Sequence, residues 1–136
     1  MRIIYATETD YEYIREHDRH VLEHLIAQKI RQKEIYLFKS DNDDTIGWMR
    51  YGYFWDNTPF MNMIWIDEPY RGKGFGRTAI RFWEDEMKQK GFRLAMTSTL
   101  SNEEAQHFYR KSGYRDSGCL LLEREPLEII FTKNLC

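Results

Sequence analysis

The chain has 136 residues, which suits one small domain with a single hydrophobic core. Hydrophobic residues make up 42% of the sequence and aromatic residues 15%, which excludes general disorder. The formal net charge of −2 provides no basic field, so we expect no nucleic-acid partner. We therefore expect one domain over residues 1–136.

Nothing in the sequence indicates a membrane or an oxidising compartment. No apolar run approaches the roughly 20 residues of a membrane helix, and the first residues enter a strand-like pattern instead of a signal peptide. The two cysteines, Cys119 and Cys136, lack the spacing of a metal or redox site. We expect reduced thiols in a cytoplasmic protein with no membrane partner.

The first half of the chain predicts one strand, a helical region and three further strands. Residues 3–6 predict the first strand, and residues 10–33 predict helix in two pieces with one apolar stripe. Residues 34–40 and 45–55 predict a hairpin around an Asp/Asn-rich turn. Residues 60–66 predict the next strand.

The second half continues the alternation of helices and strands. Ser101 and Glu104 form a capping box for its second helix, which we expect to end at Ser112. The other predicted elements are a helix, a strand and a terminal hairpin, at residues 78–90, 93–99, 118–124 and 127–133. This order indicates an α/β (α+β) fold without internal repeats.

A glycine-rich loop follows the strand at residues 60–66. This segment, the glycine loop, is Arg71-Gly72-Lys73-Gly74-Phe75-Gly76-Arg77. Glycines at alternate positions allow backbone turns that other residues disfavour, and they allow a ligand to approach closely. A turn that leads into a helix directs backbone N–H groups outward at the positive end of the helix dipole. The segment therefore predicts a phosphate-binding loop, to which its basic side chains add positive charge.

The loop can be compared with three known phosphate-binding glycine patterns. The spacing of a P-loop is absent. The dinucleotide pattern is formally met by Gly74, Gly76 and Ala79, but the next strand ends in residues 97–99 without the acid that holds a ribose. The third pattern, Arg/Gln-x-x-Gly-x-Gly/Ala, is met by Arg71, Gly74 and Gly76, and it resembles the acetyl-CoA signature of the GCN5-related N-acetyltransferases (GNAT). A nucleotide-binding protein remains the alternative.

A second motif extends this resemblance. The residues Asn102, Ala105, Tyr109, Gly113 and Tyr114 are similar to the family pattern Asn-x-x-Ala-x-x-x-Tyr-x-x-x-Gly-Phe/Tyr. The resemblance implies a mixed twisted sheet of six to seven strands with about four helices. It also implies that the fourth and fifth strands splay apart and hold acetyl-CoA, the co-substrate, between them. The implied function is an N-acetyltransferase that uses no metal.

The resemblance also implies which residues form the site. Tyr109 is the expected catalytic proton donor, because a phenol is protonated at neutral pH and can donate to a leaving thiolate. The alternative is an aromatic side chain packed beside Phe108. We expect the strand backbone to pair with the pantetheine arm, and Asn102 either to hold the cofactor or to cap a helix. The expected cofactor-binding residues are Ile64, Trp65, Ile66, Arg71, Gly72, Lys73, Gly74, Phe75, Gly76, Arg77 and Asn102.

The sequence defines the general base and the acceptor less clearly than the proton donor and the cofactor-binding residues. Asp67, Glu68 and Asp56 are candidate bases, and each has the alternative of a solvated loop acid. The implied acceptor is a primary amine of a small molecule or a peptide. The acids that could face a cationic amine, or simply face solvent, are Glu12, Glu16, Glu123 and Glu125. Aromatic residues such as Tyr13 and Trp48 are candidates for either the core or the acceptor pocket.

Three histidines need separate consideration. His17, His20 and His24 would share one helix face at spacings of three and four residues, where they could bind zinc. We expect no metal, because no carboxylate that would orient them is identifiable. A catalytically silent acyl-CoA-binding module remains an alternative function, and a homodimer remains open.

Overall fold

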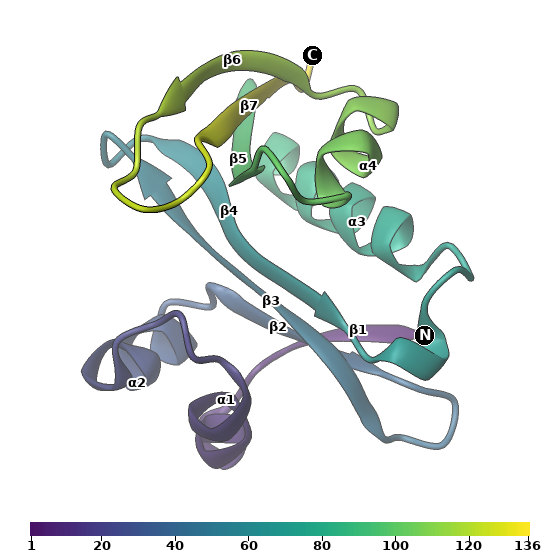
Figure 1. Ribbon diagram of the computed structural model, residues 1–136. Coiled ribbons are helices and arrows are strands. Elements are labelled where there is room, and N and C mark those ends of the chain that lie inside the picture. Colours follow the sequence, from purple (N-terminus) through teal and green to yellow (C-terminus); the bar gives the residue numbers. More distant parts are fainter. The chain divides into compact units, whose positions relative to one another are not determined.

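A computed structural model describes all residues from Met1 to Cys136. Its elements follow the predicted order (Figure 1). The first half contains β1 (Arg2–Tyr5), α1 (Tyr11–His17), α2 (Glu23–Arg31), β2 (Ile35–Lys39), β3 (Thr45–Phe54) and β4 (Thr58–Ile66). The second half contains α3 (Phe75–Gln89), β5 (Leu94–Leu100), α4 (Ala105–Lys111), β6 (Arg115–Leu120) and β7 (Glu128–Asn134). Two short 3₁₀ helices, η1 (Glu8–Asp10) and η2 (Glu68–Tyr70), precede α1 and the glycine loop.

The strands form one seven-stranded sheet in the order β1-β2-β3-β4-β5-β7-β6. β4 pairs with β5 in parallel, whereas β1 with β2, β2 with β3, β5 with β7 and β6 with β7 are antiparallel. The predicted α/β (α+β) fold, with a mixed sheet and four α-helices, is therefore confirmed.

The helical region at residues 10–33 forms two helices, as predicted, because Asp18 takes an extended backbone (ψ 105°) at the end of α1. Two other predicted boundaries were wrong. α3 begins at Phe75, three residues before its predicted start. The strand predicted at residues 118–124 lies at Arg115–Leu120 instead.

The fold divides into two compact units. The first comprises residues 1–51 and 63–76, and the second comprises residues 52–62 and 77–136. A single domain over the whole chain stays a prediction. No helix combines the length and the apolar character needed to cross a membrane.

The core of the first unit lies under α1 and α2. Ile14 of α1 and Ile26 and Ile30 of α2 are buried, because apolar residues spaced by four share one helix face. They pack with buried side chains of the sheet and of the β1–η1 junction: Ala6, Ile35, Leu37 and Trp48. This packing fixes the start of α1 and the end of α2 against the sheet.

The core of the second unit contains one buried face of α3. That face consists of Ala79, Ile80, Trp83, Glu84 and Met87, which recur at the spacing of an amphipathic helix. Glu84 is paired despite its burial, since it accepts hydrogen bonds from the Tyr114 hydroxyl (2.8 Å) and from Lys133 Nζ (3.0 Å). This network ties α3 to β7 and to Tyr114, the residue before β6.

Candidate functional site

The glycine loop has the backbone conformation that its sequence predicts. Gly72 and Gly74 have φ angles of 74° and 84°, in the left-handed region that strongly favours glycine. A Cβ atom at either position would meet nothing within 4 Å, so the requirement is conformational and not steric. α3 begins directly after the loop at Phe75. The N–H groups of Phe75, Gly76 and Arg77 therefore have no acceptor within the helix.

The Arg71 side chain lies against β4. Its Nε donates to the Ile66 carbonyl oxygen (2.6 Å), and its guanidinium carbon lies 4.5 Å from the centre of the Trp65 ring. Lys73 lies 5.7 Å from the ring centre of Tyr70. Arg71 thus joins the loop to the end of β4, and its expected contact with a phosphate stays a prediction.

β4 carries the backbone groups that were expected to pair with pantetheine. Its parallel register with β5 consists of two pairs, Phe60 with Met96 and Met61 with Thr97. Ile64, Trp65 and Ile66 lie beyond that register. Their cofactor-binding role stays a prediction.

A close backbone approach occurs between β3 and the end of β4. A Cβ atom on Gly47 would lie 2.0 Å from the Trp65 carbonyl oxygen, so only glycine fits there without a backbone shift. The Asp67 N–H also donates to the Ile46 carbonyl (2.8 Å). The sequence analysis missed Gly47, because its requirement depends on a strand that comes later in the chain.

An aromatic cluster on this unit consists of Tyr13, His17, Trp48 and Trp65. Tyr13 stacks on His17 with ring centres 4.1 Å apart, and Trp48 stacks on Trp65 at 6.1 Å. Trp48 is buried, whereas Trp65 is 41% exposed. The cluster therefore has a buried inner end and an accessible outer end.

Asp67 is the candidate base that lies at this cluster. Its Oδ1 accepts a hydrogen bond from Trp65 Nε1 (3.0 Å). Burial, followed by the negative charge of Asp67, raises the pKa of the Tyr13 phenol to about 12. Tyr13 is therefore protonated at neutral pH and lies within the field of the carboxylate.

A buried ion pair holds the segment after α1 on β3. Asp18 accepts from Arg50 Nε (2.8 Å) and Trp48 Nε1 (3.2 Å), and also from the His20 backbone N–H (3.0 Å). Burial raises the pKa of the Asp18 carboxyl, but these donors outweigh it and the net pKa is lowered. The partners lie 30 and 32 residues away in the sequence, so no local pattern predicted this network.

Tyr109, the expected proton donor, is 6% exposed in the second unit. Burial raises the pKa of its phenol to about 12, and a hydrogen bond with the Thr97 side chain partly opposes this shift. Its ring packs against Phe108, Tyr114 and Phe131, at centre distances of 5.7 to 6.0 Å. The phenol is therefore protonated at neutral pH, and its ring is held firmly.

Thr97 connects this hydroxyl to the sheet. Its Oγ1 donates to the Met61 carbonyl oxygen (2.9 Å), and Met61 and Thr97 are also paired in the β4–β5 register. The Tyr109 hydroxyl thus lies beside the last registered pair of β4 and β5.

Asn102 lies in a turn before α4 and is exposed. The predicted capping box was wrong: α4 begins at Ala105, and its N-cap residue Glu104 makes no side-chain capping bond. Gln106 Nε2 instead donates to the carbonyls of Ser101 and Glu103, both at 2.8 Å, and stabilises the turn. The role of Asn102 in cofactor binding stays a prediction.

Arg77 lines a cavity of about 160 Å³ in the second unit. Four of the side chains that line it are cationic, namely Arg77, Arg81, Lys111 and Lys133. The one acid among its lining residues, Glu84, is already bonded to Lys133 and Tyr114. The buried Ser112 Oγ has no hydrogen-bond partner. The cavity therefore carries excess positive charge.

The three histidines do not share one helix face. His17 ends α1, His20 lies in the following segment, and His24 belongs to α2. His17 Nδ1 lies 2.8 Å from the Tyr13 carbonyl oxygen. The structure contains no group of three His, Cys, Asp or Glu side chains that could hold a metal ion.

The remaining candidate acids are solvated or paired at the surface. Glu12 accepts two hydrogen bonds from Arg15, and Glu16 lies 3.8 Å from the same guanidinium. The other exposed acids lie in η2 and in turns or loops, at Asp56, Glu68, Glu123 and Glu125. Asp67 is therefore the candidate base with the most specific surroundings.

Solved structures with the same fold include several acetyltransferases. Ard1 from Thermoplasma volcanium superposes with a TM-score of 0.81 at 13% identity, covering 98% of this chain and 96% of that one. A spermidine N-acetyltransferase chimera from Vibrio cholerae and hSSAT gives 0.80 at 17%, covering 98% and 95%. A GNAT family acetyltransferase from Elizabethkingia anophelis, with acetyl-CoA bound, gives 0.76 at 21%, covering 98% and 97%.

Sequence comparison gives the family. No curated protein sequence matches this chain. A sequence model described as the acetyltransferase (GNAT) family matches residues 1–114, which include the glycine loop and the motif around Tyr109. That match covers most of the chain and agrees with the fold. The chain belongs to the GNAT family of acetyltransferases.

Proposed function

We propose that this protein transfers the acetyl group of acetyl-CoA to a primary amine of a small molecule or peptide by direct attack. The observation that carries the proposal is the glycine loop, with left-handed Gly72 and Gly74 leading directly into α3. That geometry suits a diphosphate, because first-turn N–H groups and the helix dipole favour bound anions.

Acetylation of a neutral amine moves one proton from nitrogen to sulfur, and an ammonium must first lose another. The amine lone pair attacks the thioester carbonyl carbon, a C–N bond forms, and the C–S bond breaks with its electron pair on sulfur. The nitrogen then loses a proton, and the thiolate gains one. An N–H of β4 among Ile64, Trp65 and Ile66 would stabilise the charge on the carbonyl oxygen.

Tyr109 would act on the leaving sulfur. Its pKa of about 12 lies above the roughly 8.5 of a thiol, so the phenol stays protonated while the thiolate forms. Donation from the phenol to the sulfur stabilises the thiolate as charge develops. The packed ring holds the hydroxyl in one place.

Asp67 is the proposed acceptor of the amine proton, through water. The carboxylate accepts a hydrogen bond from Trp65 Nε1, and its negative charge would attract a cationic amine. A protonated amine would bind there and must lose one proton before it attacks.

Replacing Tyr109 with Phe tests the proposal. We expect kcat for acetyl transfer to fall about 100-fold, with affinity for acetyl-CoA changed less than twofold, because only the hydroxyl is lost. Thiol release and calorimetric binding are the measurements. Tyr114→Phe is the matched control, since it removes the buried hydroxyl of the aromatic ring that packs against Tyr109 and should retain kcat.

A CoA-binding module without catalysis is the second candidate. It is favoured by the burial of Tyr109 and by its bond with Thr97, which also suit a purely structural residue. The same variants separate the two functions. A protein that binds acetyl-CoA but releases no thiol with any amine tested would support the binding module.

A further inference from the structure

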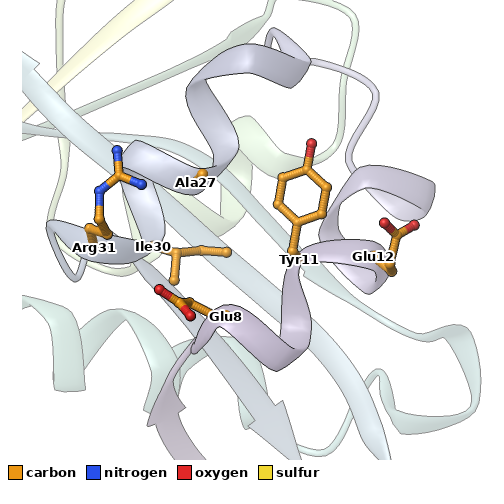
Figure 2. A pocket seen from close by; sticks show the side chains of 6 residues that line it. All are labelled: Glu8, Tyr11, Glu12, Ala27, Ile30 and Arg31. Carbon is orange, nitrogen blue, oxygen red and sulfur yellow. The ribbon is translucent and has the colours of Figure 1, made fainter.

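A cavity of about 370 Å³ lies between η1, α1 and α2 in the first unit (Figure 2). Its lining residues are Glu8, Tyr11, Glu12, Ala27, Ile30 and Arg31. The volume falls within the range of about 300 to 1,000 Å³ that small-molecule pockets occupy. The cavity has no part in the reaction proposed above.

Helix geometry explains how the cavity forms. Glu8, Tyr11 and Glu12 are spaced by three and four residues, and Ala27, Ile30 and Arg31 repeat that spacing on α2. Residues with this spacing lie on one helix face. Two such faces line the cavity, and the small Ala27 side chain leaves space where a larger residue would fill it.

The walls of the cavity are fixed before any ligand binds. The Thr7 N–H donates to Asp10 Oδ2 (2.8 Å) across η1. The last turn of α2 is held by Lys29, which donates to Glu34 (2.8 Å) and to the Tyr51 carbonyl. A rigid frame of this kind lowers the entropic cost of binding.

Three polar groups of the cavity have no partner in the protein. The Glu8 carboxylate, the Tyr11 hydroxyl and the Arg31 guanidinium make no hydrogen bond or ion pair, whereas Glu12 is paired with Arg15. The groups available to a ligand are therefore one anion, one cation and one phenol. In Figure 2, Glu8 and Arg31 flank Ile30, and Glu12 lies beyond Tyr11.

We infer that this cavity binds a free α-amino acid with an apolar side chain. The ammonium group would pair with Glu8 and the carboxylate with Arg31, because an α-amino acid carries these opposite charges on two groups bonded to the same carbon. Arg presents a planar fork that suits a carboxylate. The apolar side chain would lie against Ala27, Ile30 and the Tyr11 ring.

The placement of Tyr11 separates this cavity from the aromatic cluster. Residues advance by 100° around an α-helix, so Tyr11 and Tyr13 project about 200° apart on α1. Tyr13 belongs to the cluster with Trp65, whereas Tyr11 lines the cavity. The inferred ligand site therefore lies on the opposite flank of α1 from Asp67 and its proposed amine.

Leucine is the probe for a titration followed by methyl NMR, in the absence of acetyl-CoA. We expect saturable shifts of the Ala27 and Ile30 methyl signals, with a Kd on the order of 1 mM. N-acetylleucine lacks the ammonium charge and leucinamide lacks the carboxylate, so each should bind at least about 10-fold more weakly.

Two variants test the charged groups. Glu8→Gln and Arg31→Gln should each weaken leucine binding by at least about 10-fold. Glu23→Gln and Arg19→Gln are matched controls at exposed positions outside the cavity, and they should bind leucine like the unaltered protein. Glu8 and Arg31 are exposed and unpaired, so their replacement should leave the fold intact, which thermal unfolding checks.

Several results would overturn the inference. One is the absence of saturable shifts at Ala27 and Ile30 up to the solubility limit of leucine. Another is equal binding of leucine and leucinamide, which would exclude recognition of the carboxylate. A third is equal weakening by the control variants. Because acetyl-CoA is absent, none of these results bears on acetyl transfer.

Discussion

Tyr109 illustrates how burial sets the chemistry of a single residue. The desolvated phenol has a pKa near 12, so it keeps its proton throughout the physiological range. Such a group can stabilise a leaving thiolate by donation, but it cannot serve as a base at neutral pH. The base must therefore be sought elsewhere, and Asp67 is the acid with the most specific surroundings.

The pH profile of kcat follows from this value. Tyr109 must be protonated to donate, and its raised pKa means that the proton is lost only near pH 12. We therefore expect kcat to stay level or rise from pH 7 to 10 in a thiol-release assay. A decline in that range that is present in the unaltered protein and absent in Tyr109→Phe would contradict this assignment.

The Asp18 side chain makes a pH-dependent contribution to the free energy of unfolding. Its folded pKa is lowered, so its contribution is present above the unfolded pKa of about 3.9 and is lost as the pH falls through the folded value. We expect Asp18→Asn to reduce the free energy of unfolding by about 3 to 5 kcal/mol at pH 7, because Arg50 would remain buried without its partner.

Urea denaturation at pH 7, 5 and 3 measures this effect. The difference between the unaltered protein and Asp18→Asn should shrink towards pH 3, because the unfolded chain takes up a proton at Asp18 before the folded protein does. Asp85→Asn, at an exposed position of α3, is the control and should show no such convergence. A difference that is constant across the three pH values would show that the charge of Asp18 is not the cause.

Among the secondary-structure elements, the close approach between β3 and the end of β4 constrains the largest set of neighbouring residues. The Trp65 carbonyl occupies space next to Gly47 that a side chain would need. Trp65 in turn contacts Trp48, Asp67 and Arg71, so the position of this one strand end affects both the aromatic cluster and the glycine loop. A shift of β4 should therefore be detected at several residues at once.

Gly47→Ala tests this close approach. The added methyl would lie 2.0 Å from backbone oxygen, so β4 must move, and we expect a loss of about 3 kcal/mol with altered tryptophan fluorescence. Gly91→Ala is the control, because φ is 94° there but no atom lies within 4 Å. It should cost about 1 kcal/mol from backbone strain alone. Equal stability of Gly47→Ala and the unaltered protein would contradict the close contact.

At the scale of the whole molecule, the order of elements was predictable from sequence because apolar periodicity and turn residues are local signals. The glycine loop was found in the same way, since Gly72 and Gly74 stand where positive φ angles occur. The buried ion pair of Asp18 and the requirement at Gly47 were missed. Both depend on partners distant in the sequence, Arg50 for the first and Trp65 for the second.

The cavity lined by Glu8 and Arg31 was likewise not predictable from the sequence. No local motif marks these residues, because they lie on separate helices and meet only through packing. The family resemblance did not indicate them either. A structure was required to show that their charges lie at one cavity and remain unpaired.

Calorimetric titration with acetyl-CoA tests the central claim most directly. The unaltered protein should bind with a Kd in the micromolar range, which corresponds to about −8 kcal/mol. Gly74→Glu should abolish binding, because it places a carboxylate in the glycine loop at a φ of 84°. Gly91→Glu, which introduces the same residue at a similar φ outside the loop, should bind normally. Absence of binding by the unaltered protein, or equal binding by Gly74→Glu, would contradict acetyl-CoA binding at this loop.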